Sequence, residues 1–202
     1  MASSSFAGFR EAIREDFRDE LGSMFTDEEL DAFIDSAQRE YCVLTGALTG
    51  ECKAVVPFRR GPCIAPPDFI RPVRVVGLDG REIPEIGWRR LGADDFRHAK
   101  ASRPSFVMWD YDTWGQYRFY PACAEDYSVV GTLYYSRMPK DGVLEVRERD
   151  ALKDYALFLC FSHAGKPQAS SYYSLFSDAV AKRNSLRGSL YTRPQVRRGC
   201  FY

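Results

Sequence analysis

The spacing of apolar residues changes twice along the chain, and this change limits the possible folds more than any other feature. Apolar residues recur every three or four positions up to residue 48 and again from residue 142, as in amphipathic helices. Between them, short segments rich in Val, Ile, Tyr, Phe and Trp alternate with Pro and Gly, which is typical of strands and tight turns. The pattern predicts an α+β fold. We expect mainly a helical bundle, made of an N-terminal αα-hairpin (1–48) and two C-terminal helices (142–186), with a β-rich insertion (53–140) and an extended C-terminal arm (187–202).

Two amphipathic helices are predicted in the N-terminal hairpin. Gly22 ends the first helix, and the second begins at Thr26, which with Glu29 forms a capping box. Phe25 and Leu30 flank this cap as a hydrophobic staple, and Gly46 ends the second helix. The apolar stripe of the first helix consists of Phe6, Phe9, Ile13, Phe17 and Leu21; that of the second consists of Leu30, Phe33, Ile34, Ala37, Tyr41 and Leu44.

The middle of the chain predicts two hairpins and a further strand. Asp79-Gly80 is a favourable two-residue turn between Ile70–Leu78 and Arg81–Ile86. A second hairpin joins Phe106–Trp109 to Tyr117–Tyr120, and Ser128–Ser136 is the last strand.

Two helices follow Gly142. The first is apolar on nearly all sides, so it lies at the centre of a core or between subunits. Gly165 and Pro167 close it, and Ser170 or Ser171 starts the next helix. The first presents Ala151, Leu152, Tyr155, Ala156, Leu159 and Cys160 on one face, with Leu157, Phe158 and Phe161 around it; the second presents Tyr172, Leu175, Phe176, Ala179 and Val180.

Charge is distributed unevenly although the net charge is zero. Acidic residues dominate from Glu11 to Glu40, whereas Lys182 to Tyr202 contains basic residues and no acidic one. This polarity suits a molecule that docks onto a partner or onto copies of itself. The six cysteines form no CxxC pair and only two histidines are present, so we expect no metal, no cofactor and reduced cysteines. We expect no signal peptide and no membrane span.

Candidate catalytic groups are few. His98 could act as a general base beside Asp94 or Asp95, but no nucleophile motif accompanies it. The acidic cluster Asp27, Glu28 and Glu29 is explained by its place at a helix N-terminus, and Asp110 and Asp112 by a turn. We therefore expect no enzyme.

Aromatic and basic residues are the stronger candidates for function. Trp88, Trp109 and Trp114 could stack on bases or sugars, or serve as strand core and subunit-interface residues. The tail could bind nucleic acid, stay free in solvent, or dock into an acidic groove of a partner; its interleaved aromatics favour a binding arm. The tail residues concerned are Arg187, Tyr191, Arg193, Arg197, Arg198, Phe201 and Tyr202.

An ordered series of short motifs resembles the head-to-tail adaptors (connector or head-completion proteins) of tailed bacteriophages. The series begins with FTDEELDAFIDSAQREY (25–41) and APPDF (65–69), which leads into IRPVRVVGLDG (70–80). It continues with FYP (119–121) and VGTLYYSRMP (130–139), and ends with DALKDYALFLCF (150–161) and YYSLFSDAV (172–180). The segment 88–120 and the arginine-rich tail depart from the family pattern.

The resemblance implies a non-enzymatic virion protein made in the host cytoplasm. Such a subunit forms a ring with other copies, commonly twelvefold, beneath the portal protein. It connects head to tail, contacts a tail or nozzle protein, and lets double-stranded DNA pass without sequence specificity. In some adaptors the C-terminal arm reaches the portal, which favours docking as the role of residues 187–202. The alternative is a nucleic-acid- or carbohydrate-binding module that uses the aromatic middle segment and the basic tail.

Overall fold

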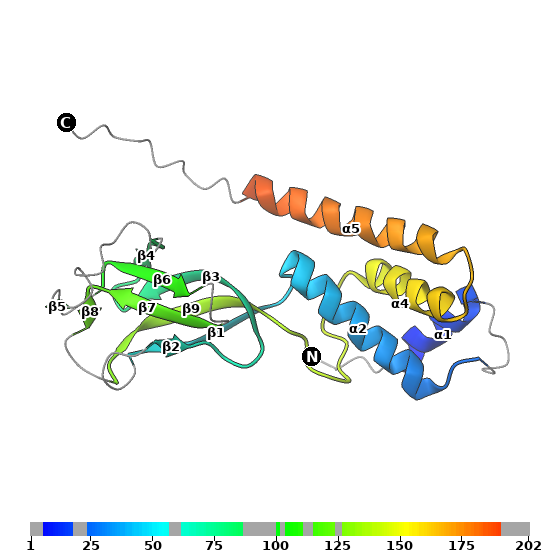
Figure 1. Ribbon diagram of the computed structural model, residues 1–202, viewed down its shortest axis with the longest axis horizontal. Coiled ribbons are helices and arrows are strands. Elements are labelled where there is room, and N and C mark those ends of the chain that lie inside the picture. Colours follow the sequence, from blue (N-terminus) through cyan, green and yellow to red (C-terminus); the bar gives the residue numbers. More distant parts are fainter. Residues whose placement is uncertain are drawn as a thin grey trace. The chain divides into compact units, whose positions relative to one another are not determined.

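The computed structural model describes residues 6–17, 24–56, 62–86, 100–101, 104–110, 115–123 and 127–190. The chain divides into two compact units (Figure 1). The helical unit combines Met1–Thr45 with Pro139–Tyr202, and the strand unit is the continuous segment Gly46–Met138.

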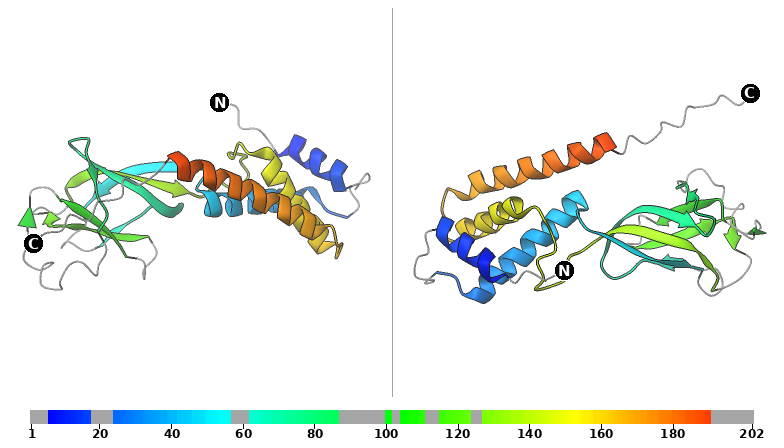
Figure 2. Two further views of the ribbon diagram at one scale, coloured as in Figure 1. Left: turned by 90° about the horizontal axis from the view of Figure 1, so that it is seen from above. Right: turned by 180° about the vertical axis from the view of Figure 1, so that it is seen from behind.

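The helical unit is built around one central helix. Its described helices are α1 (Ala7–Phe17), α2 (Asp27–Thr45), α4 (Arg149–His163) and α5 (Ala169–Leu190). Within the unit α4 lies between α2 and α5 and also packs against α1 (Figures 1 and 2). The buried residues of α4 are Ala151, Leu152, Ala156, Leu157, Cys160 and Phe161. The nearly all-round apolar sequence of this helix is explained by its three helical neighbours.

The second helix begins and ends where the sequence signals place it, since α2 begins directly after Thr26 and ends before Gly46. The first helix, α1, is described to Phe17, and its predicted end at Gly22 lies outside the described residues. Phe6, Ile13 and Phe17 are buried along one stripe. α4 ends at His163, and the backbone turns at Gly165 with a φ of +64°, which glycine adopts without strain.

The strand unit contains two antiparallel sheets and a short parallel pair, each seen among the described residues. The four-stranded sheet has the order β1 (Thr49–Val55), β9 (Val129–Arg137), β3 (Phe69–Gly77) and β4 (Glu82–Ile83). The three-stranded sheet has the order β2 (Cys63–Ile64), β7 (Gln116–Tyr120) and β6 (Phe106–Asp110). β5 (Lys100–Ala101) pairs in parallel with β8 (Ala122–Cys123).

Both antiparallel sheets contribute to one apolar core. Val75 and Leu133 from the first sheet join Val107 and Tyr117 from the second in a single buried cluster. Trp109 is 5% exposed, and its ring stacks on Phe69 with centroids 5.8 Å apart. A core shared by two facing sheets makes this segment a structural unit in its own right.

The APPDF segment joins the beginning of β3 to the end of β9. The Tyr135 hydroxyl donates to Asp68 Oδ1 at 3.1 Å, and the Met138 amide donates to the Asp68 carbonyl at 2.7 Å. Desolvation by burial, followed by the Asp68 hydrogen bond, raises the pKa of Tyr135 to about 12. The ring of Tyr135 lies over Gly50 of β1, where an added Cβ would be 2.7 Å from its Cζ.

The expectation of a mainly helical bundle with an N-terminal αα-hairpin is wrong. The strands form two antiparallel sheets with their own buried cluster. The first helix is not simply paired with the second, because its apolar stripe packs on α4 as well: the rings of Phe17 and Phe161 have centroids 4.8 Å apart. An Asp16–Lys153 ion pair of 2.9 Å joins the same two helices.

Several predicted boundaries also differ from the structure. Strand structure begins at Thr49, ahead of residue 53, and the strand expected at Arg81–Ile86 is reduced to Glu82–Ile83. Residues 187–190, expected to start the extended arm, are the last residues of α5. Leu44 and Leu175, expected on buried faces, are 39% and 52% exposed.

Candidate assembly surfaces of the helical unit

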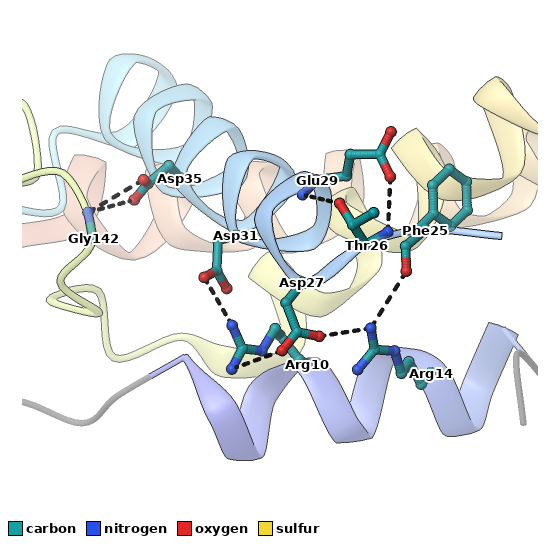
Figure 3. Close-up of polar contacts among 9 residues, drawn as sticks. All are labelled: Arg10, Arg14, Phe25, Thr26, Asp27, Glu29, Asp31, Asp35 and Gly142. Atoms are coloured by element: carbon teal, nitrogen blue, oxygen red, sulfur yellow. Dashed lines mark hydrogen bonds and ion pairs between the residues drawn. The ribbon is translucent and has the colours of Figure 1, made fainter. Parts of the chain in front are cut away.

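The acidic first turn of α2 is bound by two arginines of α1 (Figure 3). Arg10 reaches Asp27 at 3.4 Å and Asp31 at 2.9 Å, and Arg14 reaches Asp27 at 2.7 Å. Arg14 also donates to the Phe25 carbonyl at 3.3 Å. These carboxylates complete ion pairs between two helices, so they are structural groups.

The capping box at the start of α2 is confirmed. The Thr26 amide donates to Glu29 Oε2 at 2.8 Å, and the Glu29 amide donates to Thr26 Oγ1 at 3.2 Å (Figure 3). Two amides that the helix leaves without an internal acceptor are thereby bonded. The ring of Phe25 contacts those of Phe17 and Phe33 edge-on.

One side of α2 holds the segment that leads from the strand unit into α4. Gln38 is fully buried; its Nε2 donates to the Val143 carbonyl at 3.0 Å, and its Oε1 accepts the Glu145 and Val146 amides at 2.9 and 3.3 Å. Asp35 accepts the Gly142 amide at 3.2 Å (Figure 3). Desolvation by burial is the main cause that raises the pKa of Asp35 above its ordinary value.

Arg39, one residue after Gln38, pairs with Asp141 on the same segment.

Gln38 was not predicted as an important residue. The sequence did contain a signal for it: Gln38 lies four residues after Ile34 and three before Tyr41, on the buried side of α2. A polar residue at such a position is expected to be buried and hydrogen-bonded.

α5 is attached to the unit through aromatic rings near its start and polar groups near its end. Phe176 is buried between Tyr155 and Tyr41, with centroids 4.6 and 6.3 Å away. Tyr172 stacks on Phe161 at 5.1 Å. Farther along, Asn184 Nδ2 donates to the Leu44 carbonyl at 3.3 Å.

An ion pair of 3.0 Å joins Arg183 to Glu148. Of the α5 side chains that the structure describes, Phe176 alone is buried, and the others are exposed or half-buried.

The residues predicted to contact partners fall in different places. Trp109 is a core residue, which agrees with the strand-core interpretation and removes its ring from the surface of the strand unit. Trp88 and Trp114 lie outside the described residues. Arg187 lies in α5, although its side chain is not described, and Tyr191, Arg193, Arg197, Arg198, Phe201 and Tyr202 lie outside the described residues.

The candidate catalytic groups do not form a site among the described residues. His98, Asp94, Asp95 and Asp112 lie outside them. His163 is exposed, and its Nδ1 lies 3.0 Å from the Leu159 carbonyl. Among the residues that the structure describes, no group of three His, Cys, Asp or Glu side chains is placed to hold a metal ion.

A cavity of about 250 Å³ lies at the β3–β4 turn. It is lined by exposed turn residues such as Leu78, Asp79 and Arg81. Asp79 Oδ1 accepts the Arg81 amide at 3.0 Å, so this carboxylate stabilises the turn.

Comparison with known proteins identifies the family. A model of the family described as SU10 adaptor protein matches residues 4–198. The chain belongs to the SU10 adaptor protein family. None of the curated proteins matches the chain. The resemblance to phage head-to-tail adaptors seen in the sequence motifs is thus confirmed, and the match includes both the helical and the strand unit.

Membership of the SU10 adaptor protein family makes this protein a phage structural component with an adaptor role. It also implies a place in the virion. Over the described part of the chain, no helix combines the length and apolarity needed to cross a membrane.

Proposed function

We propose that the protein is a non-enzymatic adaptor subunit that forms a ring beneath the portal and connects the phage head to the tail. The observation that carries this proposal is the family match over residues 4–198. Twelve copies would surround a lumen through which double-stranded DNA passes without sequence-specific contacts. A tail or nozzle protein would bind on the side away from the portal.

Docking to the portal is assigned to the tail, residues 187–202. Its first residues, 187–190, end α5, and residues 187–202 contain four arginines, three aromatic residues and no acidic residue. Arginine and aromatic side chains are the usual anchors of protein interfaces. The alternative of a carbohydrate- or nucleic-acid-binding module loses one of its stacking groups, since the Trp109 ring is buried.

The test is binding of the full-length protein to purified portal rings, measured by native mass spectrometry and by affinity capture. We expect twelve copies per portal, and we expect deletion of residues 191–202 to weaken binding by at least about tenfold. A variant with Arg193, Arg197 and Arg198 changed to Lys keeps the charge but loses the planar bidentate donors, so it should bind with intermediate affinity.

Two results would overturn parts of this proposal. Equal portal binding with and without residues 191–202 would rule out the tail as the docking segment. Failure of the full-length protein to bind the portal, together with salt-dependent DNA binding that the deletion abolishes, would favour the nucleic-acid-binding alternative.

A further inference from the structure

β1 is an edge strand of the four-stranded sheet, and β9 is its one partner among the described strands. The Arg137 amide of β9 donates to the Leu48 carbonyl at 3.1 Å, directly before β1 begins. Directly after β1 ends, the Val56 amide donates to the Ser128 carbonyl at 3.0 Å. Bonded residues alternate along an antiparallel strand. The even-numbered residues from 48 to 56 therefore face β9, and the odd-numbered residues of β1 direct their amides and carbonyls to the outer edge.

The outer edge of β1 is regular along its whole length. The residues that form it are Thr49, Glu51, Lys53 and Val55. Their side chains are all exposed, whereas Ala54 is buried. The one irregularity in the pairing leaves this alternation intact, because the extra residue is Val130 of β9. No backbone hydrogen bond joins the outward amides and carbonyls to another described residue, so the edge is a template for a further strand.

The charges on this edge are self-complementary. Glu51 and Lys53 lie two residues apart on the same face of the sheet, and no ion pair joins either of them to a described residue. Their neighbours on β9 are the uncharged residues Tyr134 and Thr132. Arg74 lies one strand farther in, with its guanidinium over the Tyr134 ring at 5.0 Å. The edge therefore presents one acid and one base to an incoming strand.

We propose that β1 of one copy pairs antiparallel with β1 of a second copy, with Cys52 at the centre of the pairing. Glu51 of each copy then lies opposite Lys53 of the other, and Thr49 lies opposite Val55. Each of these pairs joins two outward-facing residues, so the pairing forms up to about eight backbone hydrogen bonds. Opposite charges placed directly across an antiparallel pair stabilise it.

The other registers that join outward-facing residues are less favourable. A pairing centred on Glu51 places the two Glu51 carboxylates opposite each other, and a pairing centred on Lys53 does the same for the two ammonium groups. Like charges directly opposite one another are destabilising. Pairings centred on Gly50 or Ala54 join fewer than half of the β1 residues to the second β1. The sequence of the edge thus selects a second copy of itself in one register.

This contact goes beyond the proposed ring and does not rest on it. A two-fold contact of one surface with itself joins two copies and closes, whereas a ring of more than two copies needs a contact between two different surfaces. The β1 pairing therefore belongs to the protein before it joins the portal. In that state it covers an edge that would otherwise promote aggregation.

The test exchanges charges on β1 in the full-length protein without the portal. Lys53→Glu or Glu51→Lys alone places like charges opposite one another twice in the dimer, so each should weaken dimerisation by about tenfold. The double variant, Glu51→Lys with Lys53→Glu, restores opposite charges and should dimerise as the wild-type protein does. Glu82→Lys, at an exposed position of β4, is the matched control and should leave dimerisation unchanged. Sedimentation velocity over a concentration series measures the dissociation constant.

Oxidation of Cys52 supplies a second readout. In the proposed register the two Cys52 residues form the central pair without backbone hydrogen bonds, whose Cα atoms lie about 4.5 Å apart. A disulfide spans this distance. Oxidation by dissolved oxygen with copper–phenanthroline as catalyst, in which oxygen takes up the two thiol hydrogens, should link the dimer through Cys52, mapped by non-reducing mass spectrometry. Cys42, Cys63 and Cys160 are buried and should not link.

The outcomes decide the contact separately from the ring. A dimer that the single charge changes weaken and the double variant recovers supports the β1 pairing. A monomer at every accessible concentration, a dimer that the single changes leave intact, or a loss that the double variant does not recover would overturn it, as would a dimer in which oxidation fails to link Cys52. Portal binding by a wild-type protein that forms no dimer would leave the ring standing without the β1 pairing. A free dimer with the expected charge dependence would keep the β1 pairing even if the protein failed to bind the portal.

Discussion

Gln38 lies on the buried side of α2 and bonds three backbone groups of residues 143–146. The Val146 amide is buried, and leaving a buried amide without a partner would cost free energy. The side chain thus fixes a segment that is more than one hundred residues away in the chain. Periodicity places Gln38 among apolar positions, but it cannot tell which backbone groups Gln38 will meet.

Gln38→Ala should lower the free energy of unfolding of the helical unit by about 2–4 kcal/mol, because it removes the three hydrogen bonds and leaves a cavity. The measurement is urea denaturation followed by helical circular dichroism. Ser36→Ala is the matched control two residues away, since the exposed Ser36 hydroxyl donates to the Ala32 carbonyl of the same helix. We expect that variant to change stability by less than about 0.5 kcal/mol. Similar values for both variants would contradict the role of Gln38.

Tyr135→Phe should change how the stability of the strand unit depends on pH. Unfolded tyrosine loses its proton near pH 10, whereas the pKa of folded Tyr135 is raised to about 12. Its contribution is therefore fully present below pH 10 and is lost as pH rises toward 12. The wild-type protein should be more stable than the variant at neutral pH, and this advantage should shrink between pH 10 and 12. Denaturant titrations at a series of pH values measure the difference; a constant difference would contradict the prediction.

At the scale of elements, apolar periodicity and end signals predicted the helices well. The spacing from Phe6 to Phe17 and the Thr26 capping box correspond to real helices because both signals are local. β1 was missed because its sequence, TGECKAV, has few apolar residues. It is an edge strand whose pairing depends on β9, eighty or so positions away, and no local pattern contains that information.

The length of α5 was underestimated for a related reason. Beyond Phe176 the helix buries no further described side chain, so its sequence shows little amphipathic period although the backbone remains helical to Leu190.

Thr26→Ala should destabilise the start of α2 by about 1 kcal/mol, because the Glu29 amide loses its side-chain acceptor. Thr26→Ser keeps that acceptor and should cost little. Thermal unfolding of both variants gives the comparison. Equal stability of Thr26→Ala and the wild-type protein would mean that water replaces the cap fully.

Gly131→Ala tests the close approach of β9 to β3. An added Cβ at residue 131 would lie 2.1 Å from the Val76 carbonyl oxygen, and strand backbone cannot move aside as a side-chain end can. We expect a loss of about 3 kcal/mol or more, or failure to fold. Gly8→Ala adds the same methyl group to a helix in open space, so it should be neutral or stabilise by up to about 1 kcal/mol. Chemical denaturation distinguishes the opposite signs.

At the scale of the whole molecule, the number of helices was easier to predict than the balance between helices and strands. Residues 53–140 were expected to be an insertion into a helical bundle. The strand unit does interrupt the helical unit along the chain, but its two sheets also bury Val75, Trp109 and Leu133 in a common core. The sharing of a core by two sheets depends on pairings that span the whole segment. The tail and the segment around Trp88 lie outside the described residues, so their predicted contacts remain predictions.

The fragment 46–138 should fold when it is expressed alone. It is one continuous stretch of chain that contains both sheets and their core. We expect a cooperative unfolding transition and a dispersed amide NMR spectrum. A fragment of residues 1–45 should remain largely unfolded under the same conditions, because the residues that bury its apolar stripe come from α4. A non-cooperative transition of fragment 46–138 would show that the strand unit needs the helical unit.

The discontinuity of the helical unit has a consequence for synthesis on the ribosome. α1 and α2 emerge first, yet their central neighbour α4 follows the entire strand unit in the chain. Domains fold as they emerge from the ribosome, in N-to-C order, but here the first helices must wait for the last ones. The strand unit is therefore the first part that can fold completely during translation. The helical unit is completed only when α4 and α5 have been made, so a chain truncated before α4 should leave the apolar stripes of α1 and α2 uncovered.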